Sequence, residues 1–359
     1  MKSLKDYINE SVWDIEDNIE SDNKEFVIEE VKTFIDLNYN YPEQISQDCE
    51  FVFDEKLGKY IVNYKKTVWF ASGDEYLTNG MFKWGVVKGH FYCRELKNLK
   101  SLEGAPEYVD GSFYCSNCPK LESLKGAPKE VNGEFDCTSC AKLESLKGAP
   151  ETVGRFFACT RCENLKSLEG APERVEWQFS CKLCPKLESL KGGPKYVGGF
   201  FDCSECPKLT SLEGAPEVVE GAFYCHECTE LKSLKGAPEI MKRGGFDCTH
   251  CPNLESLEGA PKKISGIFTK KSRSYFKCGG CDKLKNLKGA PEIVNGYFSC
   301  SRCPNLVSLE GAPKKVGGDF RCAECPKLKS TQGIGKVRGE ISVRVPEWDG
   351  APDTILDMR

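Results

Sequence analysis

An excess of charge of one sign is the first thing that this chain of 359 residues lacks. It has 50 Lys and Arg against 54 Asp and Glu, which leaves a net charge of −4. A general binder of nucleic acid or of anionic membranes needs a basic stripe, so we expect neither as a partner. No apolar run approaches the roughly 20 residues of a membrane-spanning helix, and we expect no membrane insertion.

A secretion signal and enzyme motifs are missing as well. Residues 1–7 include Lys2 and Lys5, but no apolar core follows them, as a secretion signal would require. We therefore expect a reducing cytoplasm, where thiols stay thiols. The chain has 3 His and no phosphate-binding glycine loop, nucleophile elbow or His-Glu-x-x-His motif. These absences predict a protein without enzymatic activity.

Cysteine, by contrast, is abundant and periodic. Every 22 residues the chain repeats Phe-x-Cys-x-x-Cys-x-x-Leu-x-Ser-Leu-x-Gly-Ala-Pro-x-x-Val. The spacing widens to 23 before Cys248 and to 30 before Cys278. A short fixed period is typical of a solenoid, in which each unit buries its apolar face against its neighbours. The Cys-x-x-Cys pairs begin at Cys115, Cys137, Cys159, Cys181, Cys203, Cys225, Cys248, Cys278, Cys300 and Cys322.

Each column of the repeat has a physical reason. In Phe-x-Cys, the alternation of a strand places Phe and Cys on one face and the residue between them on the other. Two leucine columns run beside the phenylalanines. Gly-Ala-Pro is turn chemistry, because Gly tolerates positive φ and Pro fixes φ without offering a donor. The pattern predicts a leucine-rich repeat solenoid, mainly β, with parallel strands and 22-residue repeats.

The domain organisation follows from where the pattern begins and ends. Residues 1–66 predict a small α+β N-terminal cap, with a helix that contains Val27 and Val31 and a hairpin of residues 51–54 and 60–64. Residues 67–345 form the solenoid of about eleven full repeats, and residues 346–359 a C-terminal tail. Counting back 22 from Phe91 reaches Trp69 in a degenerate first strand, and a last strand is expected at 341–343.

The repeat resembles known families. Leu-x-x-Leu-x-Gly-Ala-Pro-x-x-Val followed by Phe-x-x-x-x-Cys is similar to the leucine-rich repeats of the bacterial surface-protein type (BspA-like, Treponema). It also resembles leucine-rich repeat proteins of tailed bacteriophages, in which Asn often replaces the second Cys. Residues 1–11 are similar to the N-termini of phage proteins, head-targeted ones included. The resemblance implies a phage- or prophage-encoded protein in the host-cell cytoplasm or the virion, and it supplies no catalytic residue.

The cysteines admit several interpretations. Cys₄ zinc sites could form from the pairs of neighbouring repeats, and disulfides or redox chemistry are further alternatives. Buried free thiols are the plainest reading, because Cys behaves as a small hydrophobe. Ala71 and Val343 in the first-Cys column and Leu96 in the second favour that reading, with no cofactor. The zinc alternative would use Cys115, Cys118, Cys137, Cys140, Cys203, Cys206, Cys225 and Cys228.

The Phe, Cys, Leu and Gly-Ala-Pro positions repeat and form a constant framework. We therefore expect function to depend on the residues that vary between repeats. Solenoids bind through an exposed strand face and its loops, and aromatic residues anchor many interfaces. We expect a monomer that binds a protein partner, host or virion, by this face. An insertion between Ile264 and Phe276 adds cations. The candidate partner-binding residues are Tyr92, Tyr114, Phe156, Trp177, Phe200, Tyr224, Lys270, Lys271 and Arg273.

Overall fold

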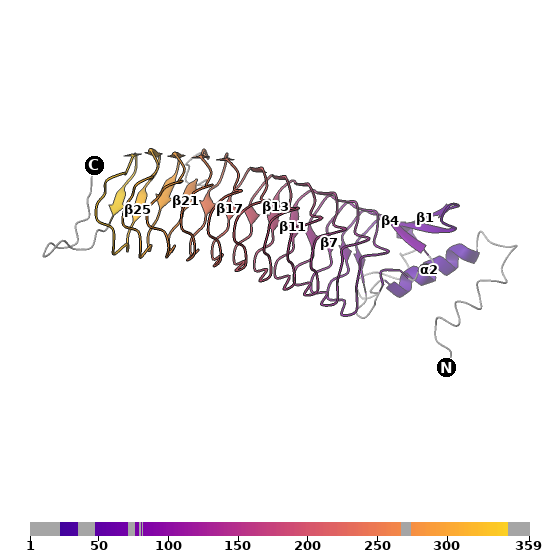
Figure 1. Ribbon diagram of the computed structural model, residues 1–359. Coiled ribbons are helices and arrows are strands. Elements are labelled where there is room, and N and C mark those ends of the chain that lie inside the picture. Colours follow the sequence, from indigo (N-terminus) through magenta and orange to yellow (C-terminus); the bar gives the residue numbers. More distant parts are fainter. Residues whose placement is uncertain are drawn as a thin grey trace.

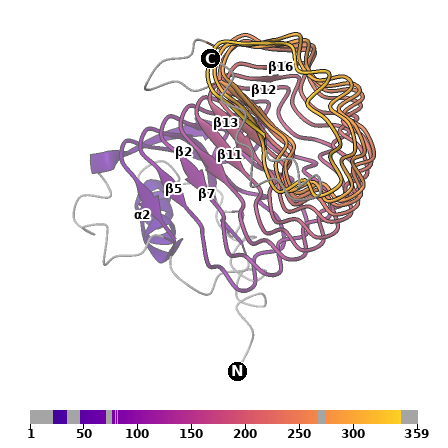
Figure 2. The same cartoon turned by 90° about the vertical axis from the view of Figure 1, so that its left-hand side faces the viewer.

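The chain forms one long solenoid in the computed structural model, with α2 and β1 near one end and β25 toward the other (Figure 1). The structure describes residues 22–34, 47–70, 76–78, 80, 82–266 and 274–343. Seen from the end, successive turns lie on one another as stacked rings (Figure 2). The predicted parallel-strand solenoid of 22-residue repeats is confirmed.

The N-terminal part contains the predicted helix and hairpin. Helix α2 spans Asp22–Phe34 and buries Val27 and Val31. Strands β1 (Cys49–Asp54) and β2 (Lys59–Tyr64) pair antiparallel. Strand β2 then pairs in parallel with β4 (Phe82–Val87). The hairpin is thus hydrogen-bonded directly into the solenoid. The predicted C-terminal tail, residues 346–359, lies outside the described residues, and the domain boundaries stay predictions.

The phenylalanine columns form a sheet of thirteen strands. Phe and the first Cys of each repeat face the core, as the alternation predicts. We call this the phenylalanine sheet. Its strands are β3 (Val68–Trp69), β5 (Phe91–Tyr92), β7 (Phe113–Tyr114), β9 (Phe135–Asp136), β11 (Phe156–Ala158), β13 (Gln178–Ser180), β15 (Phe201–Asp202), β17 (Phe223–Tyr224), β19 (Phe246–Asp247), β21 (Tyr275–Lys277), β23 (Tyr297–Ser299), β25 (Phe320–Cys322) and β27 (Ile341–Val343).

A second set of strands was not predicted. The dipeptide that ends in the Val column pairs in parallel with its copy in the next repeat, in a nine-stranded and a five-stranded sheet. The ladder is interrupted between β16 and β18. After β1, β2 and β4 these strands are β6 (Tyr108–Val109), β8 (Glu130–Val131), β10 (Thr152–Val153), β12 (Arg174–Val175), β14 (Tyr196–Val197), β16 (Val218–Val219), β18 (Ile240–Met241), β20 (Lys263–Ile264), β22 (Ile293–Val294), β24 (Lys315–Val316) and β26 (Lys336–Val337).

The core is a set of columns in which like stacks on like. From Phe91 to Phe320, consecutive phenylalanine rings lie 5.0–5.6 Å apart between centroids, nine of the ten pairs being stacked and the Phe201–Phe223 pair tilted. Aromatic pairs at this distance contribute about 0.5–1.5 kcal/mol beyond the area they bury. The leucine, cysteine and valine columns are equally buried. The stack gives the solenoid one continuous core.

The register of the first strand corrects one prediction. Phe91 pairs with Val68, and Tyr92 pairs with Trp69. Trp69 therefore does not occupy the phenylalanine column, and the spacing to the first repeat is 23 residues. Phe70 follows Trp69 and is buried in the position that aligns with Cys93. Ala71, which was assigned to that position, lies outside the described residues.

The Gly-Ala-Pro corner needs its glycine. Gly148 has a φ of +90°, and a Cβ there would lie 2.6 Å from the backbone nitrogen of Lys125 in the preceding repeat. Positive φ strains residues with a Cβ, and the close approach of two backbones leaves no room for one. The corner thus sets how tightly successive turns can stack.

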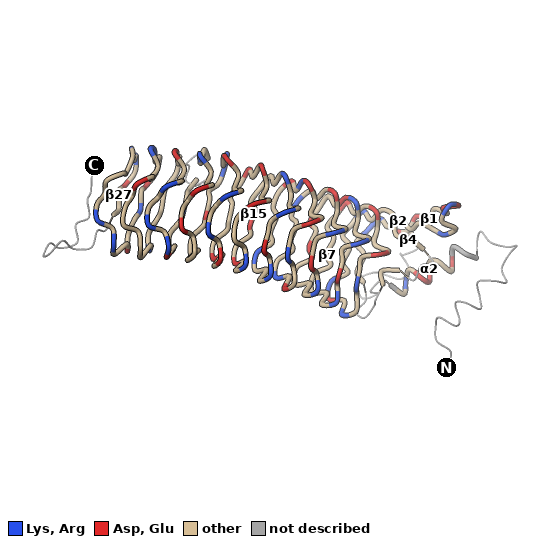
Figure 3. The backbone as a smooth tube through the Cα atoms, in the orientation of Figure 1, with Lys and Arg blue, Asp and Glu red and all other residues tan. Residues whose placement is uncertain are grey.

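Charged residues of both signs alternate over the surface along the whole solenoid (Figure 3). Many form ladders between repeats, such as Lys166 with Glu144 at 3.0 Å. Both side chains of this pair are more than half exposed, and exposed pairs contribute little.

Gly148→Ala should destabilise the solenoid by about 2 kcal/mol or more, from strain and from contact with the Lys125 backbone. Gly80→Ala is the matched control, because Gly80 has a φ of +89° with nothing described within 4 Å of a Cβ. It should lose only the strain, about 1 kcal/mol. Urea denaturation of both variants gives the comparison, and equal losses would show that crowding at the corner is unimportant.

Candidate functional site

The cysteines of the repeat are buried, free thiols. All 22 are unpaired, and every one is buried. Burial raises the pKa of the Cys118 thiol from 9.0 to about 11 and that of Cys184 to about 12. Burial likewise holds the pKa of Cys115 and Cys203 well above 9.0. At neutral pH these side chains are protonated, whereas nucleophiles and metal ligands require the thiolate.

The thiols hydrogen-bond between repeats in a fixed pattern, which we call the thiol ladder. The second Cys of each pair donates from Sγ to the carbonyl oxygen of the first Cys in the preceding repeat. In the Cys140–Cys115 contact the distance is 3.3 Å, and all ten contacts measure 3.3–3.4 Å. A buried carbonyl without a partner costs free energy, so these weak donors have a structural use.

A left-handed residue between the two cysteines aims the second thiol. Glu205, between Cys203 and Cys206, has a φ of +57°. The N–H of Glu205 donates to the carbonyl of His226 in the next repeat, and the thiol of Cys206 then reaches the carbonyl of Cys181 in the preceding repeat. The equivalent residues, all with positive φ, are Glu95, Asn117, Ser139, Arg161, Leu183, Glu227, His250, Gly280, Arg302 and Glu324.

The geometry does not gather the cysteines for zinc. Structural zinc needs four ligands around one point, but the second thiol of each pair is directed at a carbonyl of the neighbouring repeat. In the part of the chain that the structure describes, no group of three or more His, Cys, Asp or Glu could hold a metal ion. This holds for the eight cysteines of the zinc alternative, from Cys115 to Cys228.

The ends of the cysteine columns show what the positions accept. Val343 pairs with Cys322 and is buried. Leu96 takes the second-Cys position of its repeat and is also buried. Phe70 fills the first-Cys position of β3. Apolar side chains of three sizes therefore replace cysteine where a repeat meets an end of the stack.

The residue that follows each column Phe forms the outward row on the other face of the phenylalanine sheet. The row is less exposed than the alternation suggests. Tyr92, Tyr114, Tyr224, Lys277 and Ser299 are half-buried, Ala158, Ser180, Asp202 and Asp247 are buried, and Arg321 is exposed.

An aromatic stack begins the outward row. Trp69 lies on Tyr92 with ring centroids 3.6 Å apart, and Tyr92 on Tyr114 at 4.7 Å. The Arg94 guanidinium lies 5.6 Å from the Tyr92 ring. His90 accepts the Ser112 N–H at Nδ1, 2.9 Å away. Two predicted binding residues, Tyr92 and Tyr114, thus share one rigid cluster with Trp69.

A second cluster combines aromatic rings with buried carboxylates. Phe200 and Tyr224 meet edge to face at 5.8 Å. Asp202 pairs with Tyr224 across the strands. Farther on, Tyr275 and Tyr297 stack at 5.5 Å. The pKa of Tyr275 is raised mainly by burial and secondly by a side-chain hydrogen bond with Tyr224.

The remaining predicted binding residues are dispersed. Phe156 is half-buried on β11, and Trp177 is 53% exposed in the column where most repeats carry Gly. Neither contacts the two clusters through any described ring interaction. Lys270, Lys271 and Arg273 lie outside the described residues.

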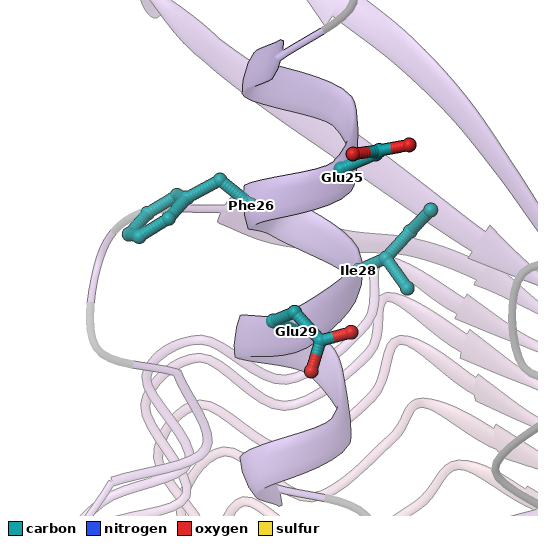
Figure 4. A pocket seen from close by; sticks show the side chains of 4 residues that line it. All are labelled: Glu25, Phe26, Ile28 and Glu29. Atoms are coloured by element: carbon teal, nitrogen blue, oxygen red, sulfur yellow. The ribbon is translucent and has the colours of Figure 1, made fainter.

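The depressions found among the described residues are open to solvent. A shallow depression on α2 is lined by Glu25, Phe26, Ile28 and Glu29, which point to different sides of the helix (Figure 4). Another lies between the Gly-Ala-Pro corners around Pro216. Within the described ranges, no helix combines the length and apolar character that a bilayer span demands.

The sequence matches no protein-family model and no curated protein. Among solved structures, a leucine-rich repeat protein from Bacteroides ovatus ATCC 8483 is similar, with 16% identity and a TM-score of 0.31. The similarity covers 78% of this chain and 80% of that chain. The assignment of this chain to the solenoid class rests on its own strands and columns.

Alkaline pH should unfold the solenoid. The pKa of Cys184 and Cys228 is raised from 9.0 to about 12, so the folded state holds protons that the unfolded chain releases. Their stabilising contribution is therefore complete below pH 9 and is lost as the pH rises toward 12. Circular dichroism and thiolate absorbance, followed together, should change in one transition. Ionisation near pH 9 with the fold intact would contradict burial of the thiols.

Cys203→Val should change the free energy of unfolding by less than about 1 kcal/mol, since an S–H donor is weak and Val343 occupies the same column. Urea denaturation measures this change. Elemental analysis of protein purified without added metal should find no stoichiometric zinc. A loss of several kcal/mol, as when a structural metal site is broken, together with bound zinc, would restore the zinc interpretation.

Proposed function

We propose that the chain is a non-catalytic protein-binding scaffold that holds its partner on the outward row of the phenylalanine sheet. Solenoids of this kind commonly serve as interaction scaffolds because they present long regular surfaces. The observation that carries the proposal is the aromatic lining of this one face. Half-buried rings lie at Tyr92, Tyr114 and Tyr224 in the outward row and at Phe200, which directly precedes the column residue Phe201 and contacts Tyr224.

Trp177 is a further exposed aromatic side chain, two residues before the column residue Phe179. It is 53% exposed, and a regular turn does not need it, since glycine fills its column in most repeats. Large exposed aromatic side chains are the usual anchors of interfaces. The Phe, Cys and Leu positions are the same from repeat to repeat, whereas the outward row varies. Such variation is expected of a surface specialised for one partner.

One constellation of Asp, Ser and His argues against catalysis. Ser204 donates its hydroxyl proton to Asp202 Oδ1, 2.6 Å away, and its Oγ lies 3.0 Å from His226 Nδ1. A nucleophilic serine must give its proton to the histidine, whereas this one gives it to the carboxylate. Ser204 is also fully buried. The trio therefore fixes a turn and offers no reactive oxygen.

The resemblance to phage repeat proteins supports a finer proposal. The protein would be phage- or prophage-encoded and monomeric, and would act in the host-cell cytoplasm or the virion. Its partner would be a host or virion protein. The near-neutral surface with both signs of charge interleaved favours a protein partner over nucleic acid.

Trp177→Ala and Phe200→Ala should each lower recovery of the partner about tenfold, because each removes an aromatic anchor. The measurement is affinity capture from a lysate of the native host, with mass spectrometry of the bound protein. Ile240→Ala is the matched control, since Ile240 is an apolar residue that is 50% exposed on β18, outside the phenylalanine sheet. Charge reversal of Lys270, Lys271 and Arg273 tests the insertion separately. Equal capture by all variants would contradict an interface anchored by Trp177 and Phe200.

A further inference from the structure

Three repeats carry Asp in the outward row, followed two residues later by Ser or Thr. In each, Asp Oδ1 accepts the backbone N–H of that residue, and the acceptors are Asp136, Asp202 and Asp247. At Asp202 and Asp247 the hydroxyl donates to the same oxygen, at 2.6 and 2.7 Å. These hydrogen bonds satisfy Oδ1 of the aspartate, and Oδ2 remains available to the residue on the next strand.

At Asp247 the chain supplies a cation. Lys277 follows on the next strand and pairs directly with Asp247. Its Nζ lies 3.0 Å from Asp247 Oδ2 and 4.6 Å from the centre of the Tyr275 ring. The ammonium group is thus held by a buried carboxylate on one side and an aromatic face on the other, as charge pairing and cation–π attraction favour.

At Asp202 the opposite position on the next strand supplies no cation. The next strand carries Tyr224 opposite Asp202, and Phe200 lies two residues before Asp202 in the sequence. Asp202 is only 9% exposed, yet among the described residues its Oδ2 has no hydrogen-bond donor and no ion pair. A buried carboxylate oxygen without a partner is costly. Two aromatic rings lie beside Asp202, Phe200 just before its strand and Tyr224 on the next strand, whereas the single ring at Asp247 is Tyr275 on the next strand.

We propose that Asp202, Phe200 and Tyr224 receive one basic side chain, Arg or Lys, of the protein partner. The inference rests on the proposed function, which it deepens by naming the chemistry that the partner presents. Arginine fits best, because its flat guanidinium stacks on aromatic rings and can donate to a carboxylate at the same time. The acceptor is held in place by Ser204, so it is preorganised for the incoming cation.

The test uses N-acetylarginine amide as the probe and the backbone amide NMR signal of Ser204, whose N–H donates to Asp202, as the readout. The full chain should show a saturable shift with this probe. N-acetylcitrulline amide, a neutral molecule of nearly the same shape, should produce none. Asp202→Asn should weaken the arginine response at least tenfold. Asp136→Asn is the matched control in the same motif, and it should leave the response unchanged within twofold.

Tyr224→Lys provides an independent variant that does not depend on tolerance of Asp202→Asn. It places a lysine where Lys277 stands relative to Asp247, so an internal ammonium should occupy the site. We expect this variant to lose the arginine response and to unfold at higher urea concentration. No saturable shift in the unaltered chain, an equal shift with citrulline, or a full response in either variant would overturn the inference.

The two proposals can fail separately. If the lysate partner is captured through Trp177 and Phe200 but Asp202→Asn changes neither capture nor the Ser204 signal, the scaffold stands and the basic-residue site falls. If arginine binds at Asp202 while substitutions along the outward row leave capture unchanged, the site stands and the scaffold proposal falls.

Discussion

The structure depends on one constraint, which is that every turn must stack on a copy of itself. In parallel strands with a 22-residue period, each side chain lies directly over its equivalent in the next repeat. Only side chains that pack on themselves can fill the core columns. Phenylalanine does so with rings 5.1 Å apart at Phe91 and Phe113, and the glycine corner lets successive backbones approach closely enough to keep that spacing.

The cysteines satisfy the same constraint in a second way. A thiol is small enough for the core and can still donate a hydrogen bond. The left-handed residue between each pair, such as Glu205, turns the second thiol toward a carbonyl in the preceding repeat. The periodic pairs that suggest zinc or redox chemistry in the sequence are therefore explained by packing and by the hydrogen-bonding needs of a tightly turning backbone. The proposed binding function uses the outward row, where self-stacking is not required.

The columns were predictable because burial repeats with the period. Phe, Leu and Cys were assigned correctly to the core, as was the terminal strand that contains Val343. Counting repeats placed Trp69 in the wrong column, because a single extra residue between β3 and β5 cannot be located by counting. The valine strands escaped prediction, since two residues carry too little alternation to signal a strand. The thiol ladder and the turn at Asp202 depend on backbone geometry that the spacing does not encode.

The central claim is that the cysteines are protonated, hydrogen-bonded members of the core. The S–H stretching band in the Raman spectrum of the folded protein measures this most directly, because it reports the proton on each thiol and the strength of its hydrogen bond. The account predicts a strong S–H band at neutral pH, shifted to lower frequency than in the urea-unfolded chain. A missing or weakened band in the native protein, showing metal-bound thiolate or disulfide, would contradict it.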